Sequence, residues 1–134
     1  MGLERKSIIM ETDKNKRKQI PIYTGLVKYF PKALAEVARV SYIGNQQHHP
    51  EKPLHWDRSK STDELDALTR HLFQAGEIDT DGMRHSAKVA WRALANLEKE
   101  LEDQWYVDQY NRNRKPEDRV NLRDEINREN KEIL

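Results

Sequence analysis

The chain has 134 residues, of which 36% are hydrophobic and 35% charged, and its formal net charge at pH 7 is +1. This length suits one domain, and the polar composition predicts a modest core that other subunits complete. A nucleic-acid-binding protein usually shows a clearer basic excess, so we expect no nucleic-acid polymer as partner. The absence of cysteine excludes disulfides and thiolate metal sites. No apolar run reaches membrane-spanning length, so we expect a soluble intracellular protein without a membrane partner.

The first thirty residues carry no helical pattern. Residues 1–19 are predicted to form a polar arm in which the basic run KNKRK, at 14–18, is solvated. Residues 20–30, IPIYTGLVKYF, contain Pro21 and Gly25 without a 3.6-residue period. We therefore expect extended chain lying over the core there.

Three segments carry the hydrophobic period of helices. The first runs from about 31 to 43, because Pro31 suits a first turn and Gly44 a stop. The second begins at a capping box formed by Ser61 and Glu64 and ends at Gly76. Its predicted buried stripe is Leu65, Leu68, Thr69, Leu72 and Phe73. The third covers about 84–106, with an apolar side made of Ala87, Ala90, Trp91, Leu94, Leu97 and Leu101.

The remaining segment, 107–134, is predicted to be a charged helical extension whose apolar stripe is too narrow to be stable alone. The sequence therefore predicts an all-α fold, a small bundle of three core helices within residues 20–106 plus the C-terminal helix. Such a bundle is naturally completed by homo-oligomerisation.

Two groups of polar residues in the second helix and the turn after it could carry chemistry. Asp66 and Arg70 are one helical turn apart and His71 follows, which fits either an ion pair or a ligand site in which Arg70 orients Asp66. Asp79 and Asp81 precede Gly82, so they could bind a hard cation, or Asp81 could cap the third helix.

The third helix has a polar side opposite its apolar one, comprising His85, Lys88, Arg92, Asn96 and Lys99. This side could be a solvated basic face. Alternatively, His85 and Lys88 lie in the first turns, where backbone N–H groups attract anions, and Arg92 could bind phosphate with two hydrogen bonds.

The loop at 48–60, HHPEKPLHWDRSK, raises the question of a metal site. Its histidines lack the H-x-x-x-H spacing of zinc enzymes, so His48 and His49 are expected to be bystanders. Trp56 offers a stacking surface, and its neighbours Asp57, Arg58 and Lys60 offer polar contacts. The combination suits a nucleotide, while a tryptophan that fills the core beneath a loop is the alternative.

Several ordered segments of the chain together resemble a known family. They are ALAEVARV (33–40), IGN (43–45), HWD (55–57), DALTRH (66–71), GEID (76–79), DGMRH (81–85) and AWRALANLE (90–98). The set resembles the N-terminal domain of phage-type dATP/dGTP diphosphohydrolases over about residues 20–100. Lys88 and Arg92 depart from that pattern, where His and Asn are common.

The resemblance implies a nucleotide ligand and release of pyrophosphate from a purine deoxynucleoside triphosphate with Mg²⁺ or Mn²⁺. We assign catalysis to Asp66, His71 and His85, and metal binding to Glu36, Asp66, Asp79 and Asp81. Ligand contacts are assigned to Trp56, Asp57, Arg58, Lys60, Arg70, Lys88 and Arg92. We expect the protein in the cytoplasm of a bacterial cell, encoded by the bacterium or a phage.

Two other hypotheses stay open at the level of sequence. The chain could be a non-catalytic phage sponge, without a cofactor, that sequesters a cyclic-nucleotide or ADP-ribose-type immune signal. It could also be a purely structural protein that binds partners through its charged tail. The sponge hypothesis predicts metal-independent binding that returns the ligand intact.

Overall fold

The computed structural model describes residues 11–59 and 62–133. Its α-helices are α1 (Lys14–Arg17), α2 (Pro31–His48), α3 (Glu64–Leu72), α4 (His85–Asn111) and α5 (Leu122–Ile133). A π-helical turn covers Tyr23–Val27 and a 3₁₀ turn covers Pro116–Asp118. Within these residues there is no strand beyond a single bridge between Ile78 and Arg84, so the predicted all-α fold is confirmed.

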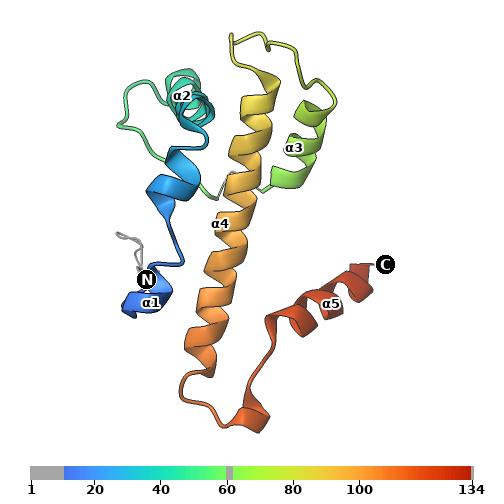
Figure 1. The fold of residues 1–134 in the computed structure, drawn as a ribbon. Coiled ribbons are helices and arrows are strands. Elements are labelled where there is room, and N and C mark those ends of the chain that lie inside the picture. Colours follow the sequence, from blue (N-terminus) through green and yellow to red (C-terminus); the bar gives the residue numbers. More distant parts are fainter. Residues whose placement is uncertain (1–10, 60–61, 134) are drawn as a thin grey trace.

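The long helix α4 is the centre of the molecule. Helix α3 runs antiparallel beside its first half, and α2 packs on another side of the same half (Figure 1). The indole N–H of Trp91 donates to the Ser41 hydroxyl at 2.7 Å and so joins α4 to α2. The buried apolar core is small, as expected, and consists of Ala67, Met83, Ala87 and Ala95.

Two expectations for the N-terminal half are wrong. Residues 22–27 are helical rather than extended, since the Lys28 N–H donates to the Tyr23 carbonyl at 2.8 Å, five residues back. Helix α2 also continues past Gly44 to His48. Asn45 explains the later end, because its buried amide donates to the carbonyls of His49 (3.3 Å) and Lys52 (3.0 Å) and so closes the helix there.

Helix α3 starts at Glu64 with Asp63 as its N-cap, and Ser61 of the predicted capping box lies outside the described residues. The Glu64 side chain is buried and reaches across to α4, where it accepts hydrogen bonds from Arg92 Nη1 (3.1 Å) and Lys99 Nζ (2.8 Å). The carboxylate is therefore used between helices. The predicted buried stripe of α3 is also wrong, since Leu65, Leu72 and Phe73 are exposed.

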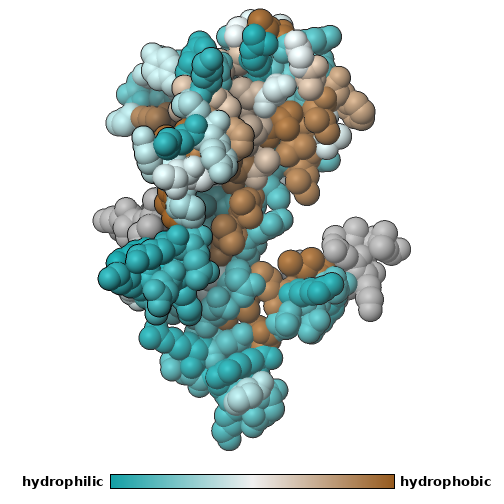
Figure 2. Space-filling model, viewed as in Figure 1, coloured by the Kyte–Doolittle hydropathy of each residue, from teal (hydrophilic) through white to brown (hydrophobic). Residues whose placement is uncertain are grey.

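Helix α4 departs from a simple amphipathic pattern, because both its polar residues and the small apolar residues Ala87 and Ala95 are packed. Its polar side faces α3 and the turn before α4, so that His85 is buried and Lys88, Arg92 and Lys99 are partly buried. Its apolar side leaves Leu94, Leu97 and Leu101 exposed by 53%, 49% and 57%. Figure 2 shows apolar surface over α3 and the middle of α4. Ion pairs with α3 explain why the polar side is the packed one.

The side chain of Asn111 connects the C-terminal segment to the end of α4. Asn111, the last residue of α4, donates to the Val120 carbonyl at 2.7 Å and accepts from the Val120 N–H at 2.9 Å. Helix α5 then extends away from the lower end of α4 (Figure 1). Among the described helices, none is long and apolar enough to cross a membrane.

Candidate functional site

A cavity of about 780 Å³ lies between α2, the loop after it, α3 and the first half of α4. This volume falls in the range of small-molecule sites. Its walls combine apolar, aromatic and polar side chains. They are Val40, Ser41, Gly44, Asn45, Gln47, His48, His49, Leu54, His55, Trp56, Asp57, His71, Asp81, Met83, Lys88, Trp91 and Arg92.

The turn between α3 and α4 positions the acidic residues of the site. Its backbone is closed by hydrogen bonds from the Asp79 N–H to the Met83 carbonyl (2.8 Å) and from the Gly82 N–H to the Asp79 carbonyl (2.9 Å). Gly82 has a φ of 82°, a conformation that side chains with a Cβ rarely adopt. Asp81 caps this turn by accepting from the Met83 N–H at 3.0 Å, and does not cap α4.

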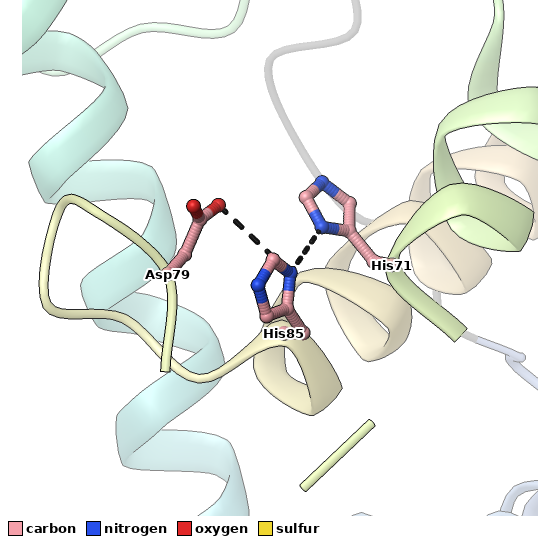
Figure 3. Close-up of side chains that lie close together, drawn as sticks. All are labelled: His71, Asp79 and His85. Atoms are coloured by element: carbon pink, nitrogen blue, oxygen red, sulfur yellow. Dashed lines mark hydrogen bonds and ion pairs between the residues drawn. The ribbon is translucent and has the colours of Figure 1, made fainter. Parts of the chain in front are cut away.

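Two histidines and an aspartate meet beside the cavity, each from a different segment (Figure 3). His71 Nδ1 lies 2.8 Å from His85 Nδ1, and His85 Nδ1 lies 3.9 Å from Asp79 Oδ2. His71 lines the cavity, whereas His85 is buried behind it. Burial, together with the nearby Lys88 ammonium, lowers the pKa of His71. The imidazole of His71 is therefore neutral near pH 7.

Lys88 bridges both aspartates of the turn. Its Nζ lies 2.6 Å from Asp79 Oδ2 and 2.7 Å from Asp81 Oδ2. The hydrogen bond from Lys88, helped by the Thr80 N–H, lowers the pKa of Asp79 to about 2. Burial acts to lower the pKa of Lys88, but its hydrogen bonds to the two aspartates outweigh that effect and raise it. All three groups are therefore charged at neutral pH.

The aromatic wall of the cavity consists of Trp56 and Trp91, whose rings meet edge to face at 5.7 Å. Arg92 lines the cavity beside them and is paired with Glu64. Within the described residues, the buried Trp56 Nε1 and Asn45 Oδ1 have no hydrogen-bond partner. A buried donor and a buried acceptor that lack partners are costly, and a bound ligand could satisfy them.

The structure brings together many of the residues that the sequence singled out. Trp56, Asp57, His71, Asp81, Lys88 and Arg92 line the cavity, and Asp79 and His85 lie directly behind it. Their convergence follows from the antiparallel pairing of α3 with α4, which brings His71 next to His85. The roles assigned to these residues stay predictions.

Other predicted site residues lie elsewhere. Glu36 pairs with Arg39 on α2 at 2.9 Å, and exposed Asp66 lies by a hollow near Asn96 and Lys99. Arg70 pairs with Asp63 (3.3 Å) rather than with Asp66. Arg58 lies over the Trp56 ring at 4.4 Å and pairs with Glu102, and Lys60 lies outside the described residues.

Sequence reasoning missed part of the cavity wall. Asn45, Gln47 and Trp91 were not chosen as site residues, although the first lies in the IGN segment and the last in AWRALANLE. His48 and His49, expected to be bystanders, also line the cavity. Asn45 and Trp91 had a signal in their place in the family pattern, although helical periodicity assigned Trp91 to the core. Gln47, His48 and His49 lie outside the segments that carry the resemblance.

The four carboxylates assigned to a metal do not converge. Glu36 and Asp66 lie away from the cavity, and Asp79 and Asp81 share the Lys88 ammonium. Among the described residues, a different set fits a metal ion. One ligand atom from each of His71, Asp79 and His85 lies within 4.8 Å of the others.

Comparison with known protein families gives one match. The family described as "dATP/dGTP diphosphohydrolase, N-terminal" matches residues 11–109. Searches among curated proteins and among solved structures gave no significant match.

Proposed function

The chain belongs to the dATP/dGTP diphosphohydrolase N-terminal domain family, and from that premise we propose that it binds a purine deoxynucleoside triphosphate in the cavity and hydrolyses it. Water would attack the α-phosphorus and the bond to the β-phosphate would break. The products are a deoxynucleoside monophosphate, pyrophosphate and a proton. The observation that carries the proposal is the cavity of about 780 Å³, around which the family segments on α2, the loop, α3 and α4 meet.

The two ends of the cavity suit the two ends of a nucleotide. Trp56 and Trp91 offer aromatic surface to a purine, and the unpartnered Trp56 Nε1 and Asn45 Oδ1 offer a donor and an acceptor to its polar atoms. Lys88 and Arg92 lie on the α4 side, toward which the phosphates would point. In this orientation the base contacts Trp56 of the loop and Trp91 of α4, and the phosphates face Lys88 and Arg92.

A triphosphate bound on the α4 side would meet carboxylates as well as cations. Lys88 is already bound to Asp79 and Asp81, and Arg92 is already bound to Glu64. Lys88 with Asp79 and Asp81 carries a net charge of −1, and Arg92 and Lys99 with Glu64 carry +1, so the two groups together offer no excess positive charge to a triphosphate. A divalent ion supplies that charge and lowers the pKa of a bound water. His71, neutral and facing the cavity, offers a nitrogen lone pair for a proton or for a cation.

The test is turnover of each of the four deoxynucleoside triphosphates with Mg²⁺, with Mn²⁺ and with chelator alone. Pyrophosphate and monophosphate are both measured, since their equal appearance identifies cleavage at the α-phosphate. We expect metal-dependent turnover of dATP and dGTP above that of the pyrimidine nucleotides. Turnover equal to the protein-free control with every nucleotide would contradict hydrolysis.

A matched pair of variants locates the reaction in the cavity. Trp56→Ala removes the proposed base platform, and Trp105→Ala removes a tryptophan far along α4 that contacts Tyr106. We expect KM to rise about tenfold or more in the first variant, since stacking on an aromatic ring contributes roughly 1–3 kcal/mol. An unchanged KM in Trp56→Ala would contradict the proposal that the base stacks on Trp56.

The sponge remains the second candidate, and the Lys88 bridge is the observation that favours it. An ammonium group already occupies the carboxylate oxygens of Asp79 and Asp81. This hypothesis predicts calorimetric binding of an intact cyclic-nucleotide or ADP-ribose-type ligand in the presence of chelator. Unchanged affinity after combined Lys88→Ala and Arg92→Ala substitution would count against it.

A further inference from the structure

Three potential metal ligands converge from three separate segments. His71 lies in the last turn of α3, Asp79 in the following turn, and His85 at the first position of α4. Figure 3 shows the three side chains pointing toward one another. His85 Nδ1 is the central ligand atom. It lies 2.8 Å from His71 Nδ1 and 3.9 Å from Asp79 Oδ2.

These distances match the spacing of neighbouring ligands around one ion. Imidazole nitrogens bind zinc at roughly 2.0–2.1 Å, so two of them lie about 3 Å apart at a right angle and about 3.3 Å apart at the tetrahedral angle. The Nδ1 atoms of His71 and His85 are 2.8 Å apart, so a small outward movement of one ring would reach the tetrahedral spacing. A small movement of the Asp79 side chain would shorten the longer distance to His85.

The ligands are held in place by their surroundings. His85 is only 5% exposed, and its backbone N–H donates to the Glu77 carbonyl at 3.1 Å. The turn that carries Asp79 is closed by its hydrogen bond to Met83. His71 alone faces the cavity, so an ion bound here would have coordination positions directed toward it.

The contact between the histidines also constrains where their hydrogens lie. Two Nδ1 atoms at 2.8 Å require one hydrogen between them, because two lone pairs repel and two N–H groups clash. A single hydrogen satisfies one nitrogen as donor and the other as acceptor. A bound cation instead uses the lone pair of each, with both rings neutral and their hydrogens on Nε2.

We propose that His71, Asp79 and His85 bind a first-row transition dication, such as Zn²⁺, Co²⁺ or Mn²⁺, in preference to Mg²⁺. Two imidazoles and one carboxylate suit these ions, whereas Mg²⁺ requires oxygen ligands in near-ideal octahedral geometry. The site uses only Asp79 from the carboxylates that sequence assigned to metal. Binding of the ion stands independently of nucleotide binding, and only its catalytic use rests on the proposed function.

Lys88 makes this site unusual, since its ammonium lies 2.6 Å from the carboxylate oxygen of Asp79 that faces His85. A positive charge so close opposes a second cation through direct repulsion and by competing for Asp79. Lys88 therefore lowers the affinity of the site for a divalent ion. Lys88→Met retains most of the side-chain length without the charge, and it tests this part of the proposal.

The experiment is a Co²⁺ titration of the untagged, chelator-treated chain without nucleotide, followed by visible absorption and calorimetry. We expect saturable binding of one Co²⁺ per chain with a visible d–d band, displaced by Zn²⁺ and not by excess Mg²⁺. His71→Ala and Asp79→Asn should weaken binding about tenfold or more, and Lys88→Met should tighten it about tenfold. His55→Ala removes a cavity histidine outside the cluster and should leave the affinity unchanged.

The outcomes separate the metal site from the enzymatic proposal. The absence of saturable Co²⁺ binding by the wild-type chain overturns the site, whatever the variants do. Equal binding by wild type and His71→Ala, with matching circular dichroism spectra, overturns it as well. Binding with the expected variant pattern supports the site even when no nucleotide is hydrolysed. Hydrolysis that persists in His71→Ala would support the enzymatic proposal and would show that the ion at this site takes no part in catalysis.

Discussion

The Nζ of Lys88 lies 2.6 Å from Asp79 Oδ2 and holds the turn between α3 and α4 against the start of α4. The same ammonium binds Asp81 at 2.7 Å, so one side chain fixes both aspartates of the turn. Any change in the charge of this group alters both the turn and the electrostatics of the cavity.

Acid should weaken the fold through Asp79. Its pKa of about 2 in the folded state lies below the ordinary 3.8, so its contribution is present above pH 3.8 and is lost as pH falls through 2. The full linkage value is about 2 kcal/mol, and solvent screening of this partly exposed pair reduces it to about 1 kcal/mol. Urea unfolding in chelator between pH 7 and pH 2 measures the effect.

Asp79→Asn is the control for this pH dependence. The variant should be less stable than wild type near pH 7 and should lose less stability on acidification. Parallel pH profiles of the two proteins would show that Asp79 does not contribute through its charge.

Glu64 is expected to be the strongest electrostatic contact between α3 and α4. It is 5% exposed and bonded to Arg92 and Lys99, so Glu64→Gln leaves two partly buried cations with a weaker partner. We expect a loss of about 2 kcal/mol in the free energy of unfolding, below the 3–5 kcal/mol typical of fully buried pairs. Glu98→Gln, on the exposed part of α4, should change stability by less than about 0.5 kcal/mol.

Two glycines should respond in opposite directions to alanine. Gly82 has a φ of 82°, so Gly82→Ala strains the turn and should destabilise the protein by about 1 kcal/mol or more. Gly44 lies inside α2 with nothing within 4 Å of an added Cβ, and Gly44→Ala should stabilise by about 0.4–1 kcal/mol. Thermal melts of both variants measure the contrast, and equal shifts would contradict it.

The predicted homo-oligomer can be tested on α4. Leu94, Leu97 and Leu101 lie on its exposed side, and a second copy of the chain would cover this surface with the same surface of its own. Sedimentation velocity should show self-association that Leu97→Lys with Leu101→Lys abolishes. A wild-type chain that sediments as a monomer at every accessible concentration would contradict the prediction.

The sequence predicts where α3 and α4 lie in the chain better than it predicts which of their sides is packed. Helical periodicity and end signals placed both helices within a few residues, because these signals are local. The same periodicity predicts that Leu65, Leu72 and Phe73 are buried, and this prediction is wrong. It assumes that the apolar side of a helix is the packed one. Glu64, Arg92 and Lys99 reverse this by bonding the polar sides of α3 and α4 together.

The all-α class and the family follow from the sequence alone, which also identified His71, Asp79, His85 and Lys88 as polar residues of interest. Which of these residues meet depends on how the helices pack. Antiparallel pairing of α3 with α4 brings His71 within 2.8 Å of His85, fourteen residues later, while Asp66 on the same helix remains on an exposed side. Side-chain direction in a helix changes by about 100° per residue, so which residues converge depends on how each helix is rotated against its neighbour.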